Sequence, residues 1–286
     1  MKYTATLLYI CSLLTWGGCN QPTPSKEEPI KVISFNIRLD APSDGVNNWK
    51  FRKENISQML KYYSPDLLGM QEVCHNQMED LKTVLPEYTP IGVGRDDGKE
   101  AGEYSPIFFR SNRFTMLDQG NFSLSEHPDT FGIKGWDASY NRIATWVILE
   151  DKKNRQQFLY INTHLDNDGE IARKEGVRLI ANKIKSIAPN LPAILTGDFN
   201  CGPHDEPLSI LEENQMINAM QKATICYGPR KTFHDFGRLS KEQQLLLDYI
   251  YTSNNCRTER FRVIQDTPDD GYLSDHNPII ANIIIK

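Results

Sequence analysis

The sequence predicts a layered α/β domain in which two packed β-sheets are flanked by helices. Two observations support this prediction: about ten segments have the composition of strands, and hairpin-like runs of strands stand beside units in which a helix and a strand alternate. A third observation concerns domain number, because residues 30–286 contain no linker-like stretch that would mark a boundary. We therefore expect a single domain over residues 30–286.

Local patterns predict the individual elements. Residues 30–37 (IKVISFNI) alternate in character and are rich in β-branched side chains, which is typical of a strand. Apolar residues recur at helical spacing over 49–63, which predicts an amphipathic helix that ends near the Ser-Pro pair at 64–65. Asp168 is expected to cap another helix, with an apolar face between Val177 and Ile187. Further strands are expected at 66–73, 105–110, 113–122, 142–150, 157–164, 191–200, 247–252, 260–265 and 277–285.

Composition and charge limit the possible functions. The chain has 286 residues, of which 39% are hydrophobic and 24% charged, as in ordinary globular proteins. Its formal net charge is −5. A protein held to long nucleic acid by electrostatics is usually basic, because phosphate neutralisation supplies most of the non-specific affinity. No stable nucleic-acid complex is therefore expected, whereas a small phosphate ester or a nucleic-acid end remains compatible with this charge.

The first 18 residues have the features of a secretory signal. They hold one Lys and an apolar stretch too short to span a bilayer, and small residues directly precede Cys19, as in the lipobox of bacterial lipoproteins. Trp16 departs from the aliphatic residue usual there. We expect residues 1–18 to be a lipoprotein signal peptide, Cys19 to be lipidated and residues 19–29 to form a Pro-rich tether. The expected location is the outer membrane, facing the periplasm or the cell surface, with the lipid as the only membrane contact; an uncleaved anchor or a simple signal peptide is the alternative.

Four cysteines remain in the mature chain, and they form no C-x-x-C motif or regular spacing, so a zinc site is not expected. An exported compartment permits disulfides. The sequence leaves open whether Cys74, Cys201, Cys226 and Cys256 are paired or free.

Polar side chains recur at the ends of the predicted strands. In ILTGDFN (194–200), Asp198 and Asn200 share one face, because alternate residues of a strand point the same way. Turn chemistry explains each such residue singly. Strand ends of two packed sheets meet at one rim, however, where carboxylates, amides and imidazoles would form a hard-cation site with acid–base groups beside it. The residues in question are Asn36, Glu72, His164, Asp198, Asn200, Asp248, Asp275 and His276.

The motifs SFNIR, LLGMQEV, NTHLD, TGDFN, DYI and SDHNPI, in this order, resemble those of the endonuclease/exonuclease/phosphatase superfamily. They extend from residue 32 to residue 280, and the nearest members are exported bacterial proteins of the nocturnin-like and carbon catabolite repressor deadenylase type. The resemblance implies the DNase I-like fold, a four-layer α/β/β/α sandwich. It also implies metal-dependent hydrolysis of a phosphate ester by in-line attack of water.

The resemblance further implies a metal site. Glu72 would be the principal ligand, with Asn36 close by and Asp275 against the same site or a second metal. Such a site suits Mg²⁺, which takes few protein oxygens and keeps waters and substrate phosphate as its other ligands; Mn²⁺ is the alternative. The number of metals stays open.

Catalytic roles are carried over in the same way. His276 would pair with Asp248, which fixes the imidazole tautomer and stabilises the charged ring. Asp198 would orient or deprotonate water, and Asn200 would hold a phosphate oxygen. His164 would contact a phosphate oxygen or protonate the leaving group. Whether Asp198 or His276 is the base stays open.

Three further residues are candidates. In DNase I-like members the acidic partner of the residue equivalent to His164 lies seven positions before an Arg, which makes Glu103 the candidate here, before Arg110. Arg38 stands where the exonuclease III branch has an Asp, and Arg142 opens a strand whose end should lie near the rim. Both arginines are candidates for binding substrate phosphate, and a solvated strand charge is the alternative for each.

Substrate specificity is expected in four loops: 39–50, 94–104, 123–141 and 227–244. Their aromatic residues either stack on a base or sugar ring or anchor the loops on the core; they are Trp136, Tyr140, Phe233 and Phe236. The mixed charge of the loops favours a nucleotide, an oligonucleotide end or a sugar or polyol phosphate as the substrate.

Three functions are compatible with the sequence. The first is an exported Mg²⁺-dependent phosphodiesterase, either a nuclease or a related diester hydrolase. The second is a phosphomonoesterase acting on sugar or inositol phosphates, which would release inorganic phosphate. The third is a catalytically inactive, lipid-anchored binding module, although the chain retains the complete set of polar residues. We expect a monomer in each case.

Overall fold

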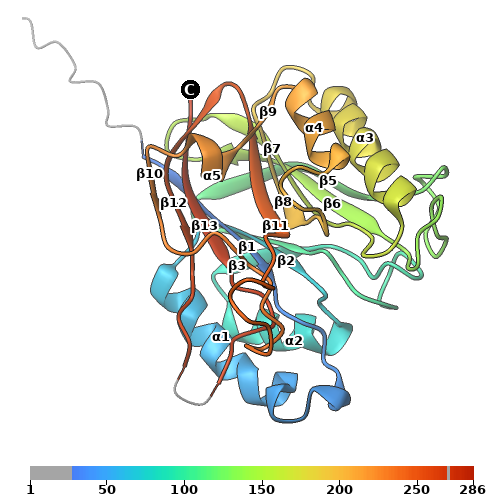
Figure 1. The fold of residues 1–286 in the computed structure, drawn as a ribbon. Coiled ribbons are helices and arrows are strands. Elements are labelled where there is room, and N and C mark those ends of the chain that lie inside the picture. The colour runs from blue at the N-terminus through green and yellow to red at the C-terminus, as the bar shows by residue number, and fades with distance from the viewer. Residues whose placement is uncertain (1–27, 269–270) are drawn as a thin grey trace, which may run out of the picture.

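The computed structural model describes residues 28–268 and 271–286, whose strands form two packed sheets (Figure 1). The segment that holds the predicted signal peptide, Cys19 and most of the tether lies outside the described residues. In spatial order, the seven-stranded sheet comprises β10 (Ile225–Tyr227), β12 (Cys256–Val263), β13 (Ile279–Ile285), β1 (Ile30–Asn36), β2 (Leu67–Gln71), β4 (Ile107–Arg110) and β3 (Tyr88–Ile91). The six-stranded sheet comprises β5 (Phe114–Ser123), β6 (Ile143–Asp151), β7 (Gln157–His164), β8 (Ala193–Asp198), β11 (Asp248–Ser253) and β9 (Met216–Asn218).

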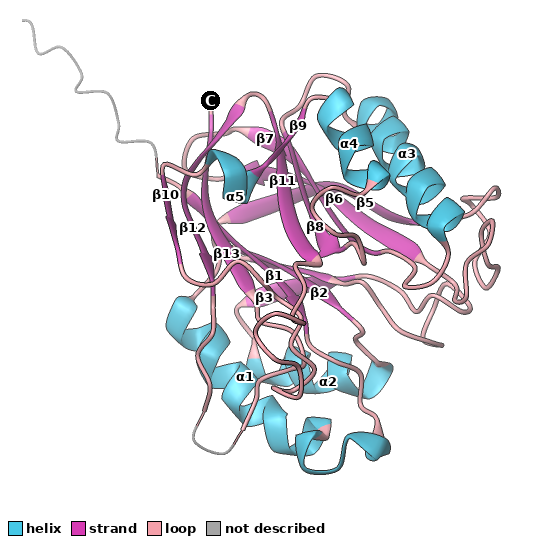
Figure 2. Ribbon diagram, in the orientation of Figure 1, coloured by secondary structure: helices cyan, strands magenta, loops and turns pink. Residues whose placement is uncertain are grey.

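Helices cover the outer face of each sheet (Figure 2). The seven-stranded sheet carries α1 (Trp49–Tyr63) and α2 (His75–Val84), and the six-stranded sheet carries α3 (Glu170–Ile187) and α4 (Glu206–Glu213). Two short elements complete the described chain, the 3₁₀ helix η1 (Pro42–Asn47) and α5 (Ala219–Lys222). The predicted four-layer α/β/β/α sandwich with two mixed sheets is therefore confirmed.

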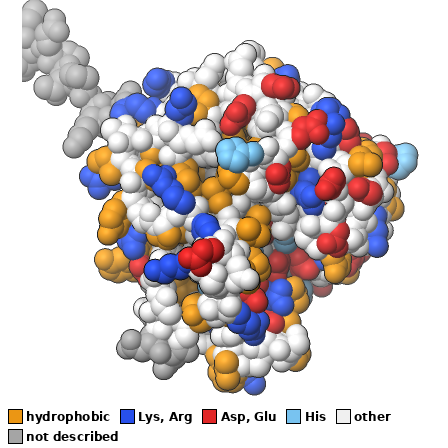
Figure 3. All heavy atoms as spheres, in the orientation of Figure 1, with side chains coloured by type: hydrophobic (Ala, Val, Ile, Leu, Met, Phe, Trp, Pro, Cys, Tyr) orange, Lys and Arg blue, Asp and Glu red, His pale blue; other side chains and the backbone are white. Residues whose placement is uncertain are grey.

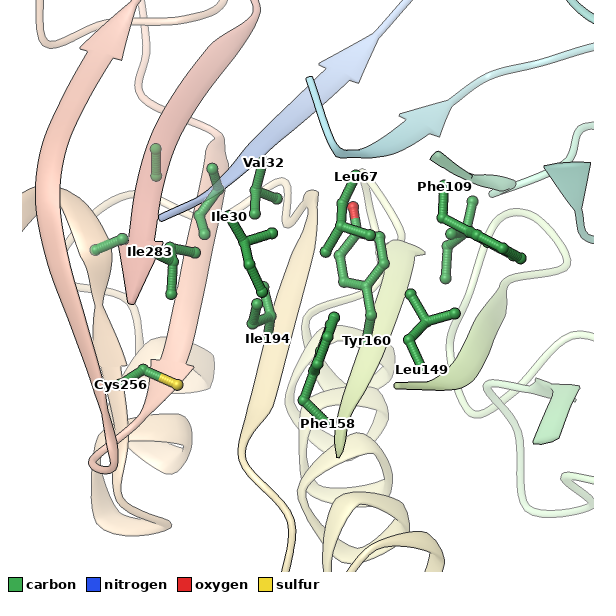
Figure 4. Packing of buried hydrophobic residues seen from close by; sticks show 14 of the residues in the cluster. Ile30, Val32, Leu67, Phe109, Leu149, Phe158, Tyr160, Ile194, Cys256 and Ile283 are labelled. Carbon is green, nitrogen blue, oxygen red and sulfur yellow. The ribbon is translucent and has the colours of Figure 1, made fainter. Parts of the chain in front are cut away.

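Three apolar clusters hold these layers together, one under each helical layer and one between the sheets. Figure 4 shows the inter-sheet cluster, with Leu67 of the seven-stranded sheet beside Tyr160 of the six-stranded sheet. Both side chains are fully buried. The central strands β2 and β8 are buried along their whole length, so each reads as a nearly continuous apolar run in the sequence.

A buried polar bridge also fixes one sheet against the other. The Nδ2 of Asn162 in β7 donates to the carbonyl oxygens of Met70 (2.7 Å) and Pro106 (3.0 Å), and its Oδ1 accepts from Nε2 of Gln71 (2.7 Å). Gly69 lies against this bridge, since a Cβ there would stand only 2.3 Å from Oγ1 of Thr196. The sheets therefore meet in a defined register close to the strand ends that carry the polar residues.

The helix after Asp168 begins differently from the prediction. Its N-cap is Gly169, and the amide groups of Ile171 and Ala172 donate to the carboxylate of Asp137 at 3.2 and 2.7 Å. The predicted cap by Asp168 was therefore wrong. The acceptor comes from the distant loop 123–141, which is a tertiary contact that local sequence does not encode.

Several short elements were not predicted. Helix α2 buries only Gln77, Met78 and Leu81, so its apolar pattern is weak in the sequence. Strand β12 begins at Cys256 rather than at residue 260 and ends at Val263. Among the described residues, Cys74, Cys201, Cys226 and Cys256 all carry free thiols, and no helix is both long and apolar enough to cross a membrane.

Candidate active site

Three neighbouring strands of the six-stranded sheet bring polar side chains to one rim. His164 ends β7 and is in register with Asp198, which ends the parallel strand β8. Asp198 is in turn in register with Asp248, which begins the antiparallel strand β11. The three side chains therefore form a row across adjacent strands, and all three are buried.

The seven-stranded sheet contributes the opposite side of the site. Asn36 ends β1, and Glu72 directly follows the parallel neighbour β2. The Nδ2 of Asn36 donates to Oε1 of Glu72 at 2.9 Å and to Oδ2 of Asp198 at 3.0 Å. The buried amide of Asn36 thus connects the strand ends of the two sheets. It places Glu72 beside Asp198 of the six-stranded sheet.

The backbone turns sharply where these strands end. Arg38, Glu72 and Asn200 have positive φ values of 58°, 60° and 48°, in the left-handed region that side chains other than Gly seldom adopt. Such conformations persist only where surrounding contacts hold them, and they cluster at functional sites. In this protein they turn three of the predicted site residues into one cleft.

His276 and Asp248 form the predicted pair. The Nδ1 of His276 is 2.8 Å from Oδ2 of Asp248, and both groups are buried. Burial alone lowers the pKa of His276, but the charges of Asp248 and Asp198 outweigh it and raise that pKa well above its ordinary value. The pair therefore holds His276 as an oriented imidazolium that presents Nε2 toward Asp198 at 3.6 Å.

Asp198 lies between the two histidines. Its Oδ2 is 3.6 Å from Nε2 of His164 and 3.6 Å from Nε2 of His276. Burial and the neighbouring charge of Asp248 raise the pKa of Asp198 to about 7. A carboxyl group of this pKa can exchange a proton near neutral pH, which suits a group that orients and deprotonates water.

His164 has the opposite character from His276. Burial and the positive charge of Arg142 hold its pKa well below the ordinary value, so the ring is neutral. Its Nε2 accepts from Nδ2 of Asn200 at 3.1 Å. The site thus combines one charged and one neutral imidazole on either side of a carboxyl group.

The predicted pairing of Glu103 with His164 is not present. Glu103 forms a two-point ion pair with Arg95, at 2.8 and 2.9 Å, and Nδ1 of His164 is buried without a hydrogen-bond partner among the described residues. The spacing before Arg110 nevertheless identified a residue of the cleft, because Glu103 lines it. Its carboxylate is taken by an arginine that the sequence prediction did not consider.

The residues around Glu72 fit a hard divalent cation. Nη1 of Arg38 lies 3.8 Å from Oε2 of Glu72 and 3.9 Å from Oδ2 of Asp275, so both carboxylates already converge on one cationic group. Burial is the main cause of the raised pKa of Asp275, and the nearby charge of Glu72 adds to it. Carboxylate and amide oxygens that converge in this way are ligands that Mg²⁺ and Mn²⁺ prefer.

Asp198, Asp248 and His276 also satisfy the distances expected of a metal site, because one ligand atom from each lies within 4.8 Å of the others. In that group, however, Nδ1 of His276 is already hydrogen-bonded to Asp248. A protonated imidazole has no lone pair for a metal. Glu72, Asn36 and Asp275 are therefore the candidate metal ligands, and Asp198, Asp248 and His276 are the candidates for proton transfer and charge stabilisation.

Glu72, Asp198, Asp275 and His276 line one cleft of about 810 Å³, and each of the four loops expected to set specificity contributes to it. Tyr140, Phe233 and Phe236 line the cleft, whereas Trp136 does not. Phe236 is buried and also lies under the guanidinium of Arg52 at 5.7 Å, so it anchors its loop as well. Phe236 therefore anchors its loop, and Tyr140 and Phe233 stay candidates for stacking on a substrate ring.

Both candidate arginines also line the cleft. Arg38 is held by Asp44 of η1 through two hydrogen bonds of 2.9 and 3.1 Å. Arg142 is buried and bonds to Asp166 at 3.2 Å, and its Nη1 has no partner among the described residues. Neither side chain is a solvated strand charge.

Sequence reasoning missed the residues that position others. Asp166 stands inside the quoted motif NTHLD, yet only the structure shows that its carboxylate accepts from the amides of Ser139 and Tyr140, both at 3.1 Å. Arg95, Asp44 and Asn167 also line or support the cleft. The one available signal was their location in the long loops or beside a motif.

The fold and this site together define a phosphoric-ester hydrolase. The endonuclease/exonuclease/phosphatase family model matches residues 33–276, and the chain belongs to that family. Human nocturnin is 25% identical over 297 residues, which cover 91% of this chain and 66% of nocturnin. The chain thus spans slightly less than two thirds of that relative.

Two solved structures are more similar in sequence. An endonuclease/exonuclease/phosphatase from Bacteroides vulgatus is 41% identical with a TM-score of 0.88, covering 90% of this chain and 99% of that one. A mannosyl-6-phosphatase from Bacteroides thetaiotaomicron is 35% identical with a TM-score of 0.85, covering 90% of this chain and 100% of that one. These likenesses extend over nearly all of the described residues.

Proposed function

We propose that this protein is a Mg²⁺-dependent phosphomonoesterase that releases inorganic phosphate from a small sugar or polyol phosphate. The sequence favoured a diester as the substrate and kept the monoester as the second candidate. One observation of the structure reverses that order, namely the pairing of the arginines in the cleft.

Every arginine that lines the cleft forms an ion pair with a carboxylate. A groove that tracks nucleic acid needs surplus cations to neutralise successive phosphates. Here the cationic groups are already balanced, and Figure 3 shows acidic and basic side chains interspersed over the face in view. A substrate with a single phosphate fits this balance better than a polyanion does. The pairs are Arg38–Asp44, Arg95–Glu103, Arg142–Asp166 and Arg238–Asp235.

The similarities to known proteins support the same order. The mannosyl-6-phosphatase is 35% identical and matched over its whole length, whereas human nocturnin is 25% identical and matched over 66% of its length. A nucleotide or oligonucleotide end remains the second candidate substrate, because Tyr140 and Phe233 offer aromatic faces in the cleft.

Different side chains of the site have different roles in hydrolysis. Asp198 orients the water and accepts its proton, and His276 stabilises the negative charge that develops on the phosphoryl group. His164 and Asn200, on the other side of Asp198, bind a phosphate oxygen or the leaving oxygen. The free Nη1 of Arg142 is a further donor for phosphate.

A divalent metal held by Glu72, Asn36 and Asp275 would neutralise phosphoryl oxygens as a Lewis acid. Mg²⁺ is the ion proposed, because its preferred ligands are oxygens and it retains open positions for substrate phosphate. Export as a lipoprotein through Cys19, a location at the outer membrane and a monomeric state remain proposals that rest on the sequence.

Product analysis on a substrate panel tests this proposal. The panel contains hexose 6-phosphates, inositol phosphates, single-stranded RNA, duplex DNA and a choline phospholipid dispersion, each incubated with Mg²⁺ and with EDTA. We expect inorganic phosphate from the hexose phosphates in the presence of Mg²⁺ only. A new monoester formed from RNA or DNA, with no phosphate released from the sugars, would restore the diesterase. Absence of hydrolysis across the panel would favour the inactive binding module.

A further inference from the structure

One wall of the cleft carries an ion pair that the catalytic chemistry does not use. Arg95 and Glu103 lie on the two arms of loop 94–104, joined by two side-chain contacts of 2.8 and 2.9 Å and by a backbone hydrogen bond from Arg95 N to Glu103 O of 3.0 Å. Their side chains are only 12% and 17% exposed, and both line the cleft. The pair is therefore built into the site rather than solvated on the outer surface.

This wall is joined to the catalytic centre by further contacts. The guanidinium of Arg95 lies over the ring of Tyr140 at 5.3 Å, and the guanidinium of Arg142 lies over the same ring at 5.4 Å. Loop 94–104 is bonded to loop 123–141 by Gly132 N to Arg95 O (3.3 Å). A continuous polar surface thus runs from His164 past Arg142 and Tyr140 to the Arg95–Glu103 pair.

The hydrogen-bonding capacity of this wall is only partly used. Nη1 of Arg142, a residue that is 6% exposed, and Nε of Arg95 are buried donors without partners among the described residues. Each oxygen of Glu103 accepts one contact from Arg95 and keeps a lone pair free. Donors and a charged acceptor therefore stand side by side around the exposed edge of Tyr140, which is 49% exposed.

This mixture selects for hydroxyl groups. A hydroxyl both donates and accepts, so it can satisfy a carboxylate and a guanidinium together. A second phosphate would be repelled by Glu103, and an apolar group would leave the buried donors unsatisfied. Tyr140 adds a flat face of the kind that packs against a sugar ring.

We propose that Arg95, Glu103 and Tyr140 form a subsite that binds the hydroxyl groups of the substrate's alcohol portion, so that the enzyme selects sugar phosphates over phosphate esters without hydroxyls. The proposal rests on the proposed function and specifies its substrate. Arg142 bridges this subsite to the phosphate.

Glu103→Gln tests the subsite with little change in side-chain volume. Kinetics are measured on mannose 6-phosphate and on p-nitrophenyl phosphate, which has the same phosphate group but no hydroxyls. We expect kcat/KM on mannose 6-phosphate to fall about 10- to 100-fold, mainly through KM, because hydrogen bonds to a charged group are lost. On p-nitrophenyl phosphate it stays within about twofold. Glu100→Gln, an exposed glutamate of the same loop, is the matched control and leaves both substrates unchanged.

Two further measurements make the result decisive. Tyr140→Ala removes a side chain that is 49% exposed and therefore loses little buried area, and we expect the same loss of preference for the sugar phosphate. Equal loss on both substrates, or no loss on either, overturns the subsite while hydrolysis itself upholds the proposed function.

Calorimetric binding of mannose 6-phosphate in EDTA tests the case in which the subsite is present but the proposed function is wrong. Binding that is weakened by Glu103→Gln, in a protein that hydrolyses neither ester, would refute the proposed function and keep the subsite.

Discussion

Replacement of His276 by Gln is expected to lower kcat by about 10²- to 10³-fold, the loss found when one group that stabilises transition-state charge is removed. Gln can still donate to Asp248, so the variant avoids leaving that buried carboxylate without a partner. It removes the imidazolium that faces Asp198 at 3.6 Å. Steady-state phosphate release measures the effect, and thermal unfolding checks that the fold is retained.

The matched control for this variant is His204→Gln, which alters an exposed histidine outside the cleft and should leave kcat unchanged. Asp248→Asn adds a readout that is independent of turnover. Because the charge of Asp248 raises the pKa of His276, that pKa should fall in the variant, and the ring should lose its proton at lower pH in an NMR titration. Full activity in His276→Gln, or an unchanged titration in Asp248→Asn, would contradict the assigned pair.

Glu72→Gln is expected to weaken divalent-metal binding by about 100-fold or more, because changes in residues behind a ligand alone cost about 10- to 100-fold. Loss of bound metal should abolish most of the hydrolysis. At a metal concentration of 100 times Kd, bound metal stabilises the folded parent protein by about 2.7 kcal/mol, and the variant should lose this stabilisation. Calorimetric titration with Mg²⁺ and Mn²⁺ and thermal unfolding with and without metal measure these effects.

Glu79→Gln, an exposed glutamate on α2, is the control for this variant and should bind metal as the parent does. The experiment also distinguishes the two groups of potential ligands. If the metal were held by Asp198, Asp248 and His276, the affinity would survive the change at Glu72, and the assignment of the metal to Glu72, Asn36 and Asp275 would be wrong.

The ordered motifs predicted much of the site because they coincide with strand ends. Asn36, Asp198 and Asp248 stand at the boundaries of β1, β8 and β11, and His276 precedes β13. Alternation along a strand determines which face a residue takes, and adjacent strands bring their ends to one rim. The pairing of His276 with Asp248 was expected from the resemblance to the family, and the position of both residues at strand ends explains why they meet.

Contacts made by the long loops could not be predicted in this way. The Arg95–Glu103 pair, the Arg38–Asp44 pair and the cap from Asp137 join residues whose proximity depends on how long loops fold over the core. No periodicity marks such residues, and spacing alone assigned Glu103 to His164 when a nearby arginine takes its carboxylate. Ion pairing in a loop is decided by geometry, since the nearest opposite charge determines the partner.

The sequence by itself determined the layered α/β class and the polar residues at the strand ends, because these depend on local periodicity and on side-chain type, and its ordered motifs indicated the class of chemistry through their resemblance to a known family. Only the tertiary structure decided which charges are paired and which imidazole is protonated. Those properties arise from burial and from the distances between charges on different elements, such as Asp198 between His164 and His276. They exist only once the two sheets have packed together.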